Sequence, residues 1–247
     1  MIRSDRVRPT KQVYASYTDE DFAVWKLLFS RQTELLKPVV SEEYLEALNR
    51  VGFTKNKIPD FNQVEEALKP YTGWRLQTVP NISEQRDFFT FLSEKKFTAT
   101  CWLRRMDELD YLEEPDMFHD VFGHVPLLSN KPYTDFFEAI SHIALGYIDN
   151  PEAIKLLGRL YWFTIEFGLI READELKIYG AGIISSYGET KNCLTDSTQK
   201  FDFDVNKIFE TDFRTDILQD TYFVIESFEQ LYHSIPEIKE QLKDRFG

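Results

Sequence analysis

Cysteine is scarce in this chain of 247 residues, which contains only Cys101 and Cys193. The two lie far apart and in no metal-binding spacing, which argues against a disulfide framework and against a cysteine-based zinc site. We expect free thiols in a reducing compartment, and therefore a cytoplasmic location. Long apolar runs are also missing. No segment approaches transmembrane length, and residues 1–6 have no apolar core of the kind found in signal peptides.

Basic residues are outnumbered, with 29 Lys and Arg against 42 Asp and Glu and a net charge of −13. Nucleic acids and anionic membrane surfaces repel such a chain, so we expect neither as a partner. Repeats, low-complexity tracts and Gly/Ser linkers are absent as well. The simplest interpretation is one catalytic domain over residues 1–247, in which residues 1–17 form an extended surface arm.

Hydrophobic residues make up 43% of the chain and aromatic residues 15%, which is enough for a thick core and an aromatic-lined pocket. Capping residues, glycines and prolines divide the chain into many helices and a few short strands. The predicted class is therefore mainly α with short β-strands (α+β), not a doubly wound sheet. Helices are expected to start after Thr18, Ser41, Asp60, Ser83, Asn150 and Ser227 and to cover 132–147, and strands are expected at 74–78 and 97–103.

Two of only four histidines, His119 and His124, lie five residues apart in a mostly apolar run. In an α-helix five residues rotate a side chain by about 140°, so one continuous α-helix would point the two imidazoles apart. Gly123 can leave helical geometry. We therefore expect His119 on a last helical turn and His124 just beyond it, with Pro126 preventing continuation. The alternative is a pair of hydrogen-bonded core histidines without a metal.

Glu166 lies in the apolar stretch 161–169, on the expected last turn of a helix that runs from Asn150 to Gly168. A buried carboxylate is costly without a cation or a metal. Two imidazoles and one carboxylate form the facial triad that holds non-haem Fe(II) with open positions. The segment Gly180-Ala181-Gly182 matches neither a dinucleotide-binding loop nor a P-loop, so a close turn beside a pocket is the better interpretation.

Three runs of residues carry a resemblance to a known family. They are 114–127, which contains both histidines; 161–169, which contains Glu166; and Tyr179-Gly180-Ala181-Gly182-Ile183-Ile184-Ser185-Ser186. In this order and spacing they resemble the iron-ligand and substrate-pocket segments of the pterin-dependent aromatic amino acid hydroxylases. The likeness extends from about Thr72 to Phe228.

The resemblance implies roles for individual residues. The metal ligands, which are also the catalytic centre, would be His119, His124 and Glu166. Arg104 would pair with the substrate carboxylate, because its planar fork suits a carboxylate. The remaining implied substrate contacts are Pro115, Trp162, Gly182 and Ser185, and the implied pterin contacts are Phe88, Asp120 and Tyr161. Asp120 stands where the family commonly has glutamate, one methylene longer.

The implied cofactors are Fe(II) and a tetrahydropterin cosubstrate, which supplies two electrons as O₂ is split. The implied reaction is hydroxylation of L-phenylalanine to L-tyrosine. A tyrosine- or tryptophan-type hydroxylase remains open, although the bulky Trp162 disfavours an indole substrate. A zinc-dependent hydrolase with Asp120 as general base and a non-catalytic interaction module also remain open. Animal members carry a regulatory domain and an assembly helix, and this chain is too short for both. We therefore expect a monomer.

Overall fold

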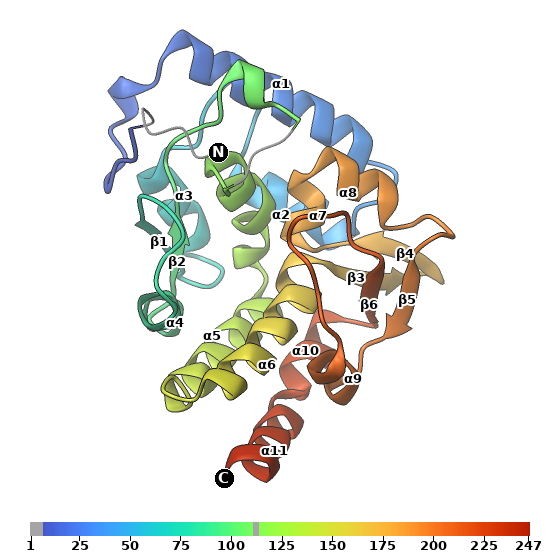
Figure 1. Ribbon diagram of the computed structural model, residues 1–247. Helices are drawn as coiled ribbons and strands as arrows, with labels where there is room; N and C mark the ends of the chain where they lie inside the picture. The colour runs from blue at the N-terminus through green and yellow to red at the C-terminus, as the bar shows by residue number, and fades with distance from the viewer. Residues whose placement is uncertain (1–6, 111–113) are drawn as a thin grey trace.

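The computed structural model describes residues 7–110 and 114–247, so the expectations for residues 1–6 lie outside the described part. Helices predominate over short strands, which confirms the predicted class. The helices are α1 (Asp19–Leu36), α2 (Glu42–Val51), α3 (Phe61–Leu68), α4 (Gln85–Ser93), α5 (Lys131–Gly146), α6 (Pro151–Tyr161), α7 (Ala181–Ser185), α8 (Tyr187–Asn192), α9 (Val205–Glu210), α10 (Phe228–His233) and α11 (Ile235–Phe246). Figure 1 shows α1 across one end and α11 at the other, with α5 and α6 between them.

Two small sheets lie on either side of the central helices (Figure 1). The first pairs β1 (Arg75–Thr78) with β2 (Lys96–Ala99) in parallel. The second has the order β4-β3-β6-β5. Its strands are β3 (Gly168–Glu172), β4 (Glu175–Ile178), β5 (Gln199–Asp202) and β6 (Thr221–Ile225). Strand β3 pairs antiparallel with β4 and parallel with β6. Within the described residues strands and helices do not alternate regularly, which agrees with the sequence-based exclusion of a doubly wound sheet.

Several helix ends follow the capping residues. The Thr18 side chain accepts a hydrogen bond from Asp21 N, and Asp21 completes a capping box. Ser41 caps α2, and Gly52 ends it with a left-handed φ of 68°, which glycine adopts without steric cost. Asn150 caps α6 through Ala153 N. These starts and stops were predictable because a cap is a local hydrogen bond between near neighbours in sequence.

Other boundaries were wrong. Helix α4 begins after Glu84, which makes no side-chain cap bond, instead of after Ser83. Strand β2 ends at Ala99 instead of Leu103. Beyond it, the backbone amide of Thr100 donates to Asp120 Oδ2 at 2.7 Å. Trp102 O accepts from Met117 N at 2.9 Å. A neighbouring segment therefore uses the polar groups that a further strand would have needed.

The expected extended arm is only partly extended. Its described part, residues 7–17, contains a 3₁₀ turn at Tyr14–Ser16. The Tyr14 hydroxyl donates to Ile58 O at 3.0 Å, and the Tyr17 hydroxyl donates to Cys101 O at 2.8 Å. These bonds attach the arm to the body of the protein.

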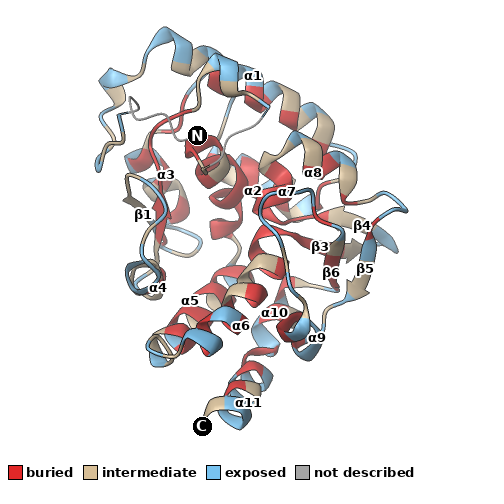
Figure 2. Cartoon of the chain, viewed as in Figure 1, coloured by how far each residue is buried: buried red, intermediate tan, exposed pale blue. Residues whose placement is uncertain are grey.

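Aromatic side chains fill the core beneath the two histidines. Phe118 and Phe122 stack at 4.7 Å between ring centroids, with 11° between their planes, and Trp25 meets Phe118 edge-on at 5.7 Å. Figure 2 shows buried residues concentrated on the inward faces of α5 and α6 and in residues 118–124, the segment that contains both histidines. Among the described residues, no helix is both long enough and apolar enough to cross a membrane.

Candidate active site

Both histidines lie on one π-helix, η3, which spans Phe118–His124. A π-helix bonds residue i to residue i+5, so residues five apart lie one turn apart on the same face. The Nε2 atoms of His119 and His124 are 3.3 Å apart. The expectation that the helix ends after His119, with His124 just beyond it, was therefore wrong, because the helix widens instead of ending.

Gly123 has a different role from the one expected. A Cβ at this position would lie 2.9 Å from Ala181 O and 3.2 Å from Ala181 Cβ. The glycine therefore allows α7 to pack directly against η3. This contact places Ser185, at the end of α7, beside the first histidine.

Glu166 is the last residue of a second π-helix, η5 (Trp162–Glu166), which follows α6 directly. Its i+5 bond runs from Phe167 N to Trp162 O at 2.8 Å. Strand β3 then begins at Gly168, where an α-helix end was expected. The carboxylate meets both imidazoles: Glu166 Oε1 lies 3.1 Å from His124 Nε2, and Glu166 Oε2 lies 3.7 Å from His119 Nε2.

The charges in this cluster favour a cation. Burial lowers the pKa of His119 to about 4, against the opposing influence of Glu166. Burial raises the pKa of Glu166, but His124 and His119 outweigh it and hold that pKa at about 2. The neighbouring Tyr161 hydroxyl lowers the pKa of Glu166 in the same direction. At neutral pH the site therefore offers a lone pair on His119 and an ionised carboxylate, the forms in which these groups bind metals.

Ser185 orients His119. Its hydroxyl donates to Ala181 O at 2.9 Å, so its oxygen is free to accept from His119 Nδ1 at 2.8 Å. The proton then resides on Nδ1, and the lone pair of Nε2 points at the other two groups, as expected of a metal-binding histidine. Sequence reasoning assigned Ser185 a substrate contact and missed this bond, for which no local signal exists.

The three side chains fit a divalent metal. A nitrogen or oxygen ligand of each residue lies within 4.8 Å of the other two. Ligands about 2.1 Å from one ion and at right angles lie about 3 Å apart, close to the separations of 3.1 and 3.3 Å found here. Two nitrogens and one carboxylate match the set expected for non-haem iron.

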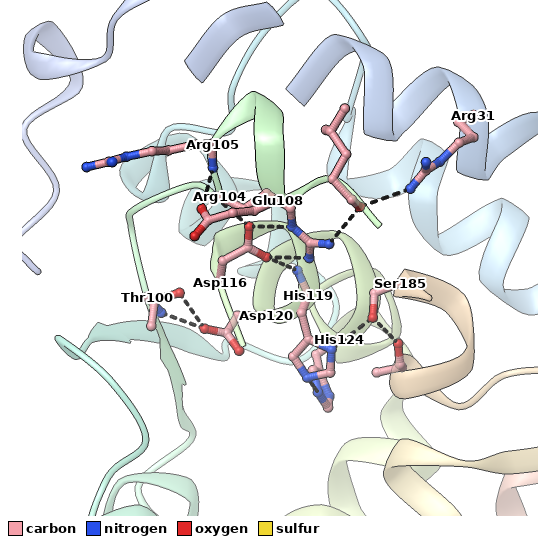
Figure 3. A network of polar contacts seen from close by, with 12 residues as sticks. Arg31, Thr100, Arg104, Arg105, Glu108, Asp116, His119, Asp120, His124 and Ser185 are labelled. Atoms are coloured by element: carbon pink, nitrogen blue, oxygen red, sulfur yellow. Dashed lines mark hydrogen bonds and ion pairs between the residues drawn. The ribbon is translucent and has the colours of Figure 1, made fainter. Parts of the chain in front are cut away.

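Arg104 forms a buried ion pair with Asp116, which is shown in Figure 3. Arg104 Nε donates to Asp116 Oδ2 and Nη2 donates to Oδ1, both at 2.9 Å. Nη1 donates to Leu109 O at 3.3 Å. Of the five N–H groups of a guanidinium, one on each terminal nitrogen makes no bond to the described residues and can bind another anion. Sequence reasoning missed Asp116, although a carboxylate in the run Pro115-Asp116-Met117-Phe118 was a signal for it.

Asp116 also supports the first histidine. Its Oδ1 accepts from His119 N at 3.2 Å, and its side chain is fully buried. Burial alone raises the pKa of Asp116, but Arg104 outweighs it and lowers that pKa. One ion pair thus connects the predicted carboxylate-binding arginine to the start of η3.

Asp120 points away from the histidines towards Thr100, just after the end of β2 (Figure 3). Its Oδ2 accepts from Thr100 N at 2.7 Å and from Thr100 Oγ1 at 2.8 Å. Burial raises the pKa of Asp120 to about 7, against these two bonds. The carboxylate is therefore fixed by its neighbours on one side.

The other expected residues surround this cluster. Phe88, on α4, meets Tyr161 edge-on at 5.6 Å. Trp162 stacks on Phe213 at 4.3 Å, with 13° between the rings. Pro115 is half-buried in the loop before η3. Gly182 is tightly packed, since a Cβ there would lie 2.8 Å from the Phe167 ring. Its observed role is close packing, and its substrate contact stays a prediction.

The sequence profile of the biopterin-dependent aromatic amino acid hydroxylases matches residues 8–247. This chain belongs to that family. It is 44% identical over 217 residues to the phenylalanine-4-hydroxylase of Ralstonia nicotianae, covering 87% of this chain and 69% of that one. It is 43% identical over 222 residues to the enzyme of Chromobacterium violaceum, covering 87% and 73%.

Solved structures of the family have the same fold. Cobalt-bound phenylalanine hydroxylase from Chromobacterium violaceum superposes with a TM-score of 0.89 and 41% identity, covering 94% of this chain and 86% of that one. The same enzyme with bound iron(III) and 7,8-dihydrobiopterin gives a TM-score of 0.87 and 42% identity, covering 93% and 84%. The resemblance inferred from the three sequence runs is thereby confirmed.

Proposed function

We propose that this chain is a phenylalanine 4-monooxygenase, which converts L-phenylalanine to L-tyrosine with O₂, Fe(II) and a tetrahydropterin. The observation that carries the proposal is the convergence of His119, His124 and Glu166 from two π-helices. Membership of the biopterin-dependent family supports it, as do relatives named phenylalanine-4-hydroxylase.

In this proposal His119, His124 and Glu166 are the iron ligands. Ser185 holds the first of them in the Nδ1–H tautomer. When bound, iron activates O₂ and the pterin supplies two electrons. The protein's own residues hold these partners together and exclude water. Most of the surrounding side chains are buried, including Phe97, whose ring centroid lies 4.8 Å from that of His124.

Arg104 is the proposed anchor for the amino acid carboxylate. Asp116 fixes the guanidinium plane through two bonds of 2.9 Å, so the two remaining N–H groups are oriented before substrate arrives. Pro115, Trp162 and Gly182 are proposed to lie on the side of the substrate ring. A preorganised donor loses less conformational entropy on binding than a free side chain would.

The pterin is proposed to bind between α4 and α6, where Phe88 offers an aromatic face and meets the Tyr161 ring edge-on. Asp120 lies near the start of η3. Because Thr100 already holds Asp120 Oδ2, we propose that Oδ1 contacts the pterin, directly or through water.

The test uses iron-loaded protein, tetrahydropterin, phenylalanine and ¹⁸O₂. We expect tyrosine carrying one ¹⁸O atom, with O₂ consumed in proportion. A zinc hydrolase would take its oxygen from water and consume no O₂. Tyrosine and tryptophan are offered in parallel, and a kcat/KM for either that equals or exceeds that for phenylalanine would contradict the substrate assignment.

We further propose a cytoplasmic monomer that binds neither nucleic acid nor membranes. Two free and buried thiols, Cys101 and Cys193, support a reducing compartment. The net charge of −13 supports the lack of polyanionic partners. The apolar face of α11, which includes Ile238 and Leu242, is buried within the chain and therefore not available for an assembly contact.

A further inference from the structure

Gln219 lies just before β6, and hydrogen bonds hold both its side chain and its backbone. Its side chain is almost fully buried, with 6% of the residue exposed. Gln219 Oε1 accepts from the indole Nε1 of Trp162 at 3.0 Å. Gln219 Nε2 donates to Arg214 O at 2.7 Å and to Ile217 O at 3.0 Å. The amide is therefore used on both sides: its oxygen holds Trp162, and its nitrogen holds the segment of chain that precedes it.

The backbone of Gln219 is fixed just as firmly. Its N–H donates to Glu189 Oε1 at 2.8 Å, and its carbonyl accepts from Asn192 Nδ2 at 2.7 Å. The second oxygen of Glu189 accepts from the Tyr222 hydroxyl at 2.6 Å. Helix α8 and strand β6 therefore set the position of the amide independently of Trp162.

Trp162 is the residue on which this arrangement acts. Its ring stacks on Phe213, which belongs to the segment that Gln219 folds, and lies 4.5 Å from the Phe167 ring centroid. Its carbonyl accepts the i+5 bond of η5, the π-helix that ends in Glu166. A change in the position of the indole therefore affects both the proposed wall of the substrate ring and the first turn of the helix that carries a proposed iron ligand.

We propose that Gln219 is a positioning and specificity-determining residue, which fixes the indole of Trp162 and folds residues 213–218 against it. The inference rests on the proposed function, because Trp162 must border the aromatic ring of the substrate. Its physical basis is the cost of leaving a half-buried indole N–H and two loop carbonyls without the partners that Gln219 provides. Gln219 acts through Trp162 and touches no reacting atom.

The test compares Gln219→Met, which keeps the side-chain length without hydrogen-bonding groups, with the iron-loaded wild type. We expect kcat/KM for phenylalanine to fall by roughly tenfold or more. The values for tyrosine and tryptophan should fall less, so that the preference for phenylalanine over these two amino acids decreases. The KM for tetrahydropterin should stay within about twofold. Deuterium exchange in residues 211–219 should become faster.

Gln219→Asn provides a milder second variant, because it keeps the amide but shortens its reach by one methylene. It should show the same changes at smaller size. Gln230→Met is the matched control. The half-buried Gln230 accepts from Glu226 N through Oε1 at 2.8 Å, and loss of this bond should leave both the kinetics and the exchange in residues 211–219 unchanged.

The inference is overturned if Gln219→Met and Gln219→Asn both retain wild-type discrimination among the three amino acids, or if both keep wild-type exchange in 211–219. Failure of the proposed function looks different, because the wild type itself would then form no tyrosine. The exchange measurement needs no substrate and still reports whether Gln219 holds the segment.

Discussion

Among single residues, Arg104 combines a structural bond and a proposed functional bond in one side chain. Arg104→Ala should raise the KM for phenylalanine by roughly ten- to a hundred-fold, as expected for a lost charge-assisted pair, and change the KM for tetrahydropterin little. Arg104→Lys should recover only part of the lost affinity for phenylalanine, because an ammonium group cannot make two parallel hydrogen bonds to a carboxylate. Steady-state kinetics with each substrate varied in turn provides the measurement.

The control for Arg104 is Arg171→Ala, which removes an arginine paired with Glu226 and Asp202 on the surface. It should leave both KM values unchanged. Since Arg104→Ala also leaves Asp116 buried without its partner, stability is measured alongside. An unchanged phenylalanine KM in a folded Arg104→Ala protein would contradict the carboxylate assignment.

The two cysteines predict how stability depends on pH. Burial raises the pKa of Cys101 to about 11 and that of Cys193 to about 12, whereas an unfolded thiol titrates near 8.5. Their contribution is therefore complete below about pH 8.5 and decreases as the pH rises towards the folded values. Between pH 8.5 and 10 the ionisation of each thiol in the unfolded chain should lower the free energy of unfolding by about 1.5 kcal/mol.

Urea unfolding at pH 8 and pH 10 tests this prediction. Cys101→Ala, Cys193→Ala and the double variant serve as controls, and the double variant should lose much less stability over the same interval. If the wild type and the double variant lost equal unfolding free energy between pH 8 and pH 10, the thiols would not be the cause of the loss of stability at alkaline pH.

Sequence chemistry placed His119, His124 and Glu166 in one cluster, and the structure brings all three side chains together. This proximity was predictable because a buried carboxylate and a pair of histidines in an apolar segment each need a polar partner in any fold. Asp116, Ser185 and Gln219 were missed in their observed roles. The partners of Ser185 and Gln219 lie on other elements, and no spacing in the sequence encodes that Ser185 would meet His119 or that Gln219 would meet Trp162.

At the scale of elements, the two π-helices are the feature that sequence periodicity could not supply. The five-residue spacing was compared with α-helical geometry, which led to the wrong expectation that the helix ends near Gly123 with His124 beyond it. The wider π-helix brings the two imidazoles to the same side without ending the helix. Caps were predictable because they are local bonds, whereas the end of β2 depends on Asp120, twenty residues from Thr100.

Gly123→Ala tests the contact between η3 and α7. The new methyl group would meet Ala181 O at 2.9 Å, and a backbone carbonyl cannot rotate away. We expect the variant to lose about 1–3 kcal/mol of unfolding free energy. It should also bind iron more weakly, because α7 carries Ser185 away from His119. Denaturant unfolding of metal-free protein and an iron titration measure the two effects.

The matched control is Gly158→Ala, within α6, where a Cβ meets nothing within 4 Å. It should stabilise the protein by about 0.5–1 kcal/mol, the usual gain for alanine in a helix. Gly123→Ala with full stability and full iron affinity would contradict the account of this packing contact.

At the scale of the whole molecule, the chain is predicted to be a monomer. Helix α11 buries Ile235, Ile238 and Leu242 against the rest of the chain. The high negative charge opposes self-association at low salt. Light scattering at micromolar concentration should give the mass of one chain, 29.2 kDa. A stable dimer or tetramer that persists on dilution would contradict this prediction.

The central claim is that His119, His124 and Glu166 hold a catalytic iron ion. The most direct measurement is the iron content of anaerobically loaded wild type, His119→Ala, His124→Ala and Glu166→Ala, with tyrosine formation assayed in the same samples. His142→Ala, which alters an exposed histidine near Glu138, is the control. We predict that wild type and His142→Ala retain a single iron ion per chain and form tyrosine, whereas each triad variant loses both with its helical circular dichroism intact. A triad variant that kept full iron content and full turnover would contradict the claim.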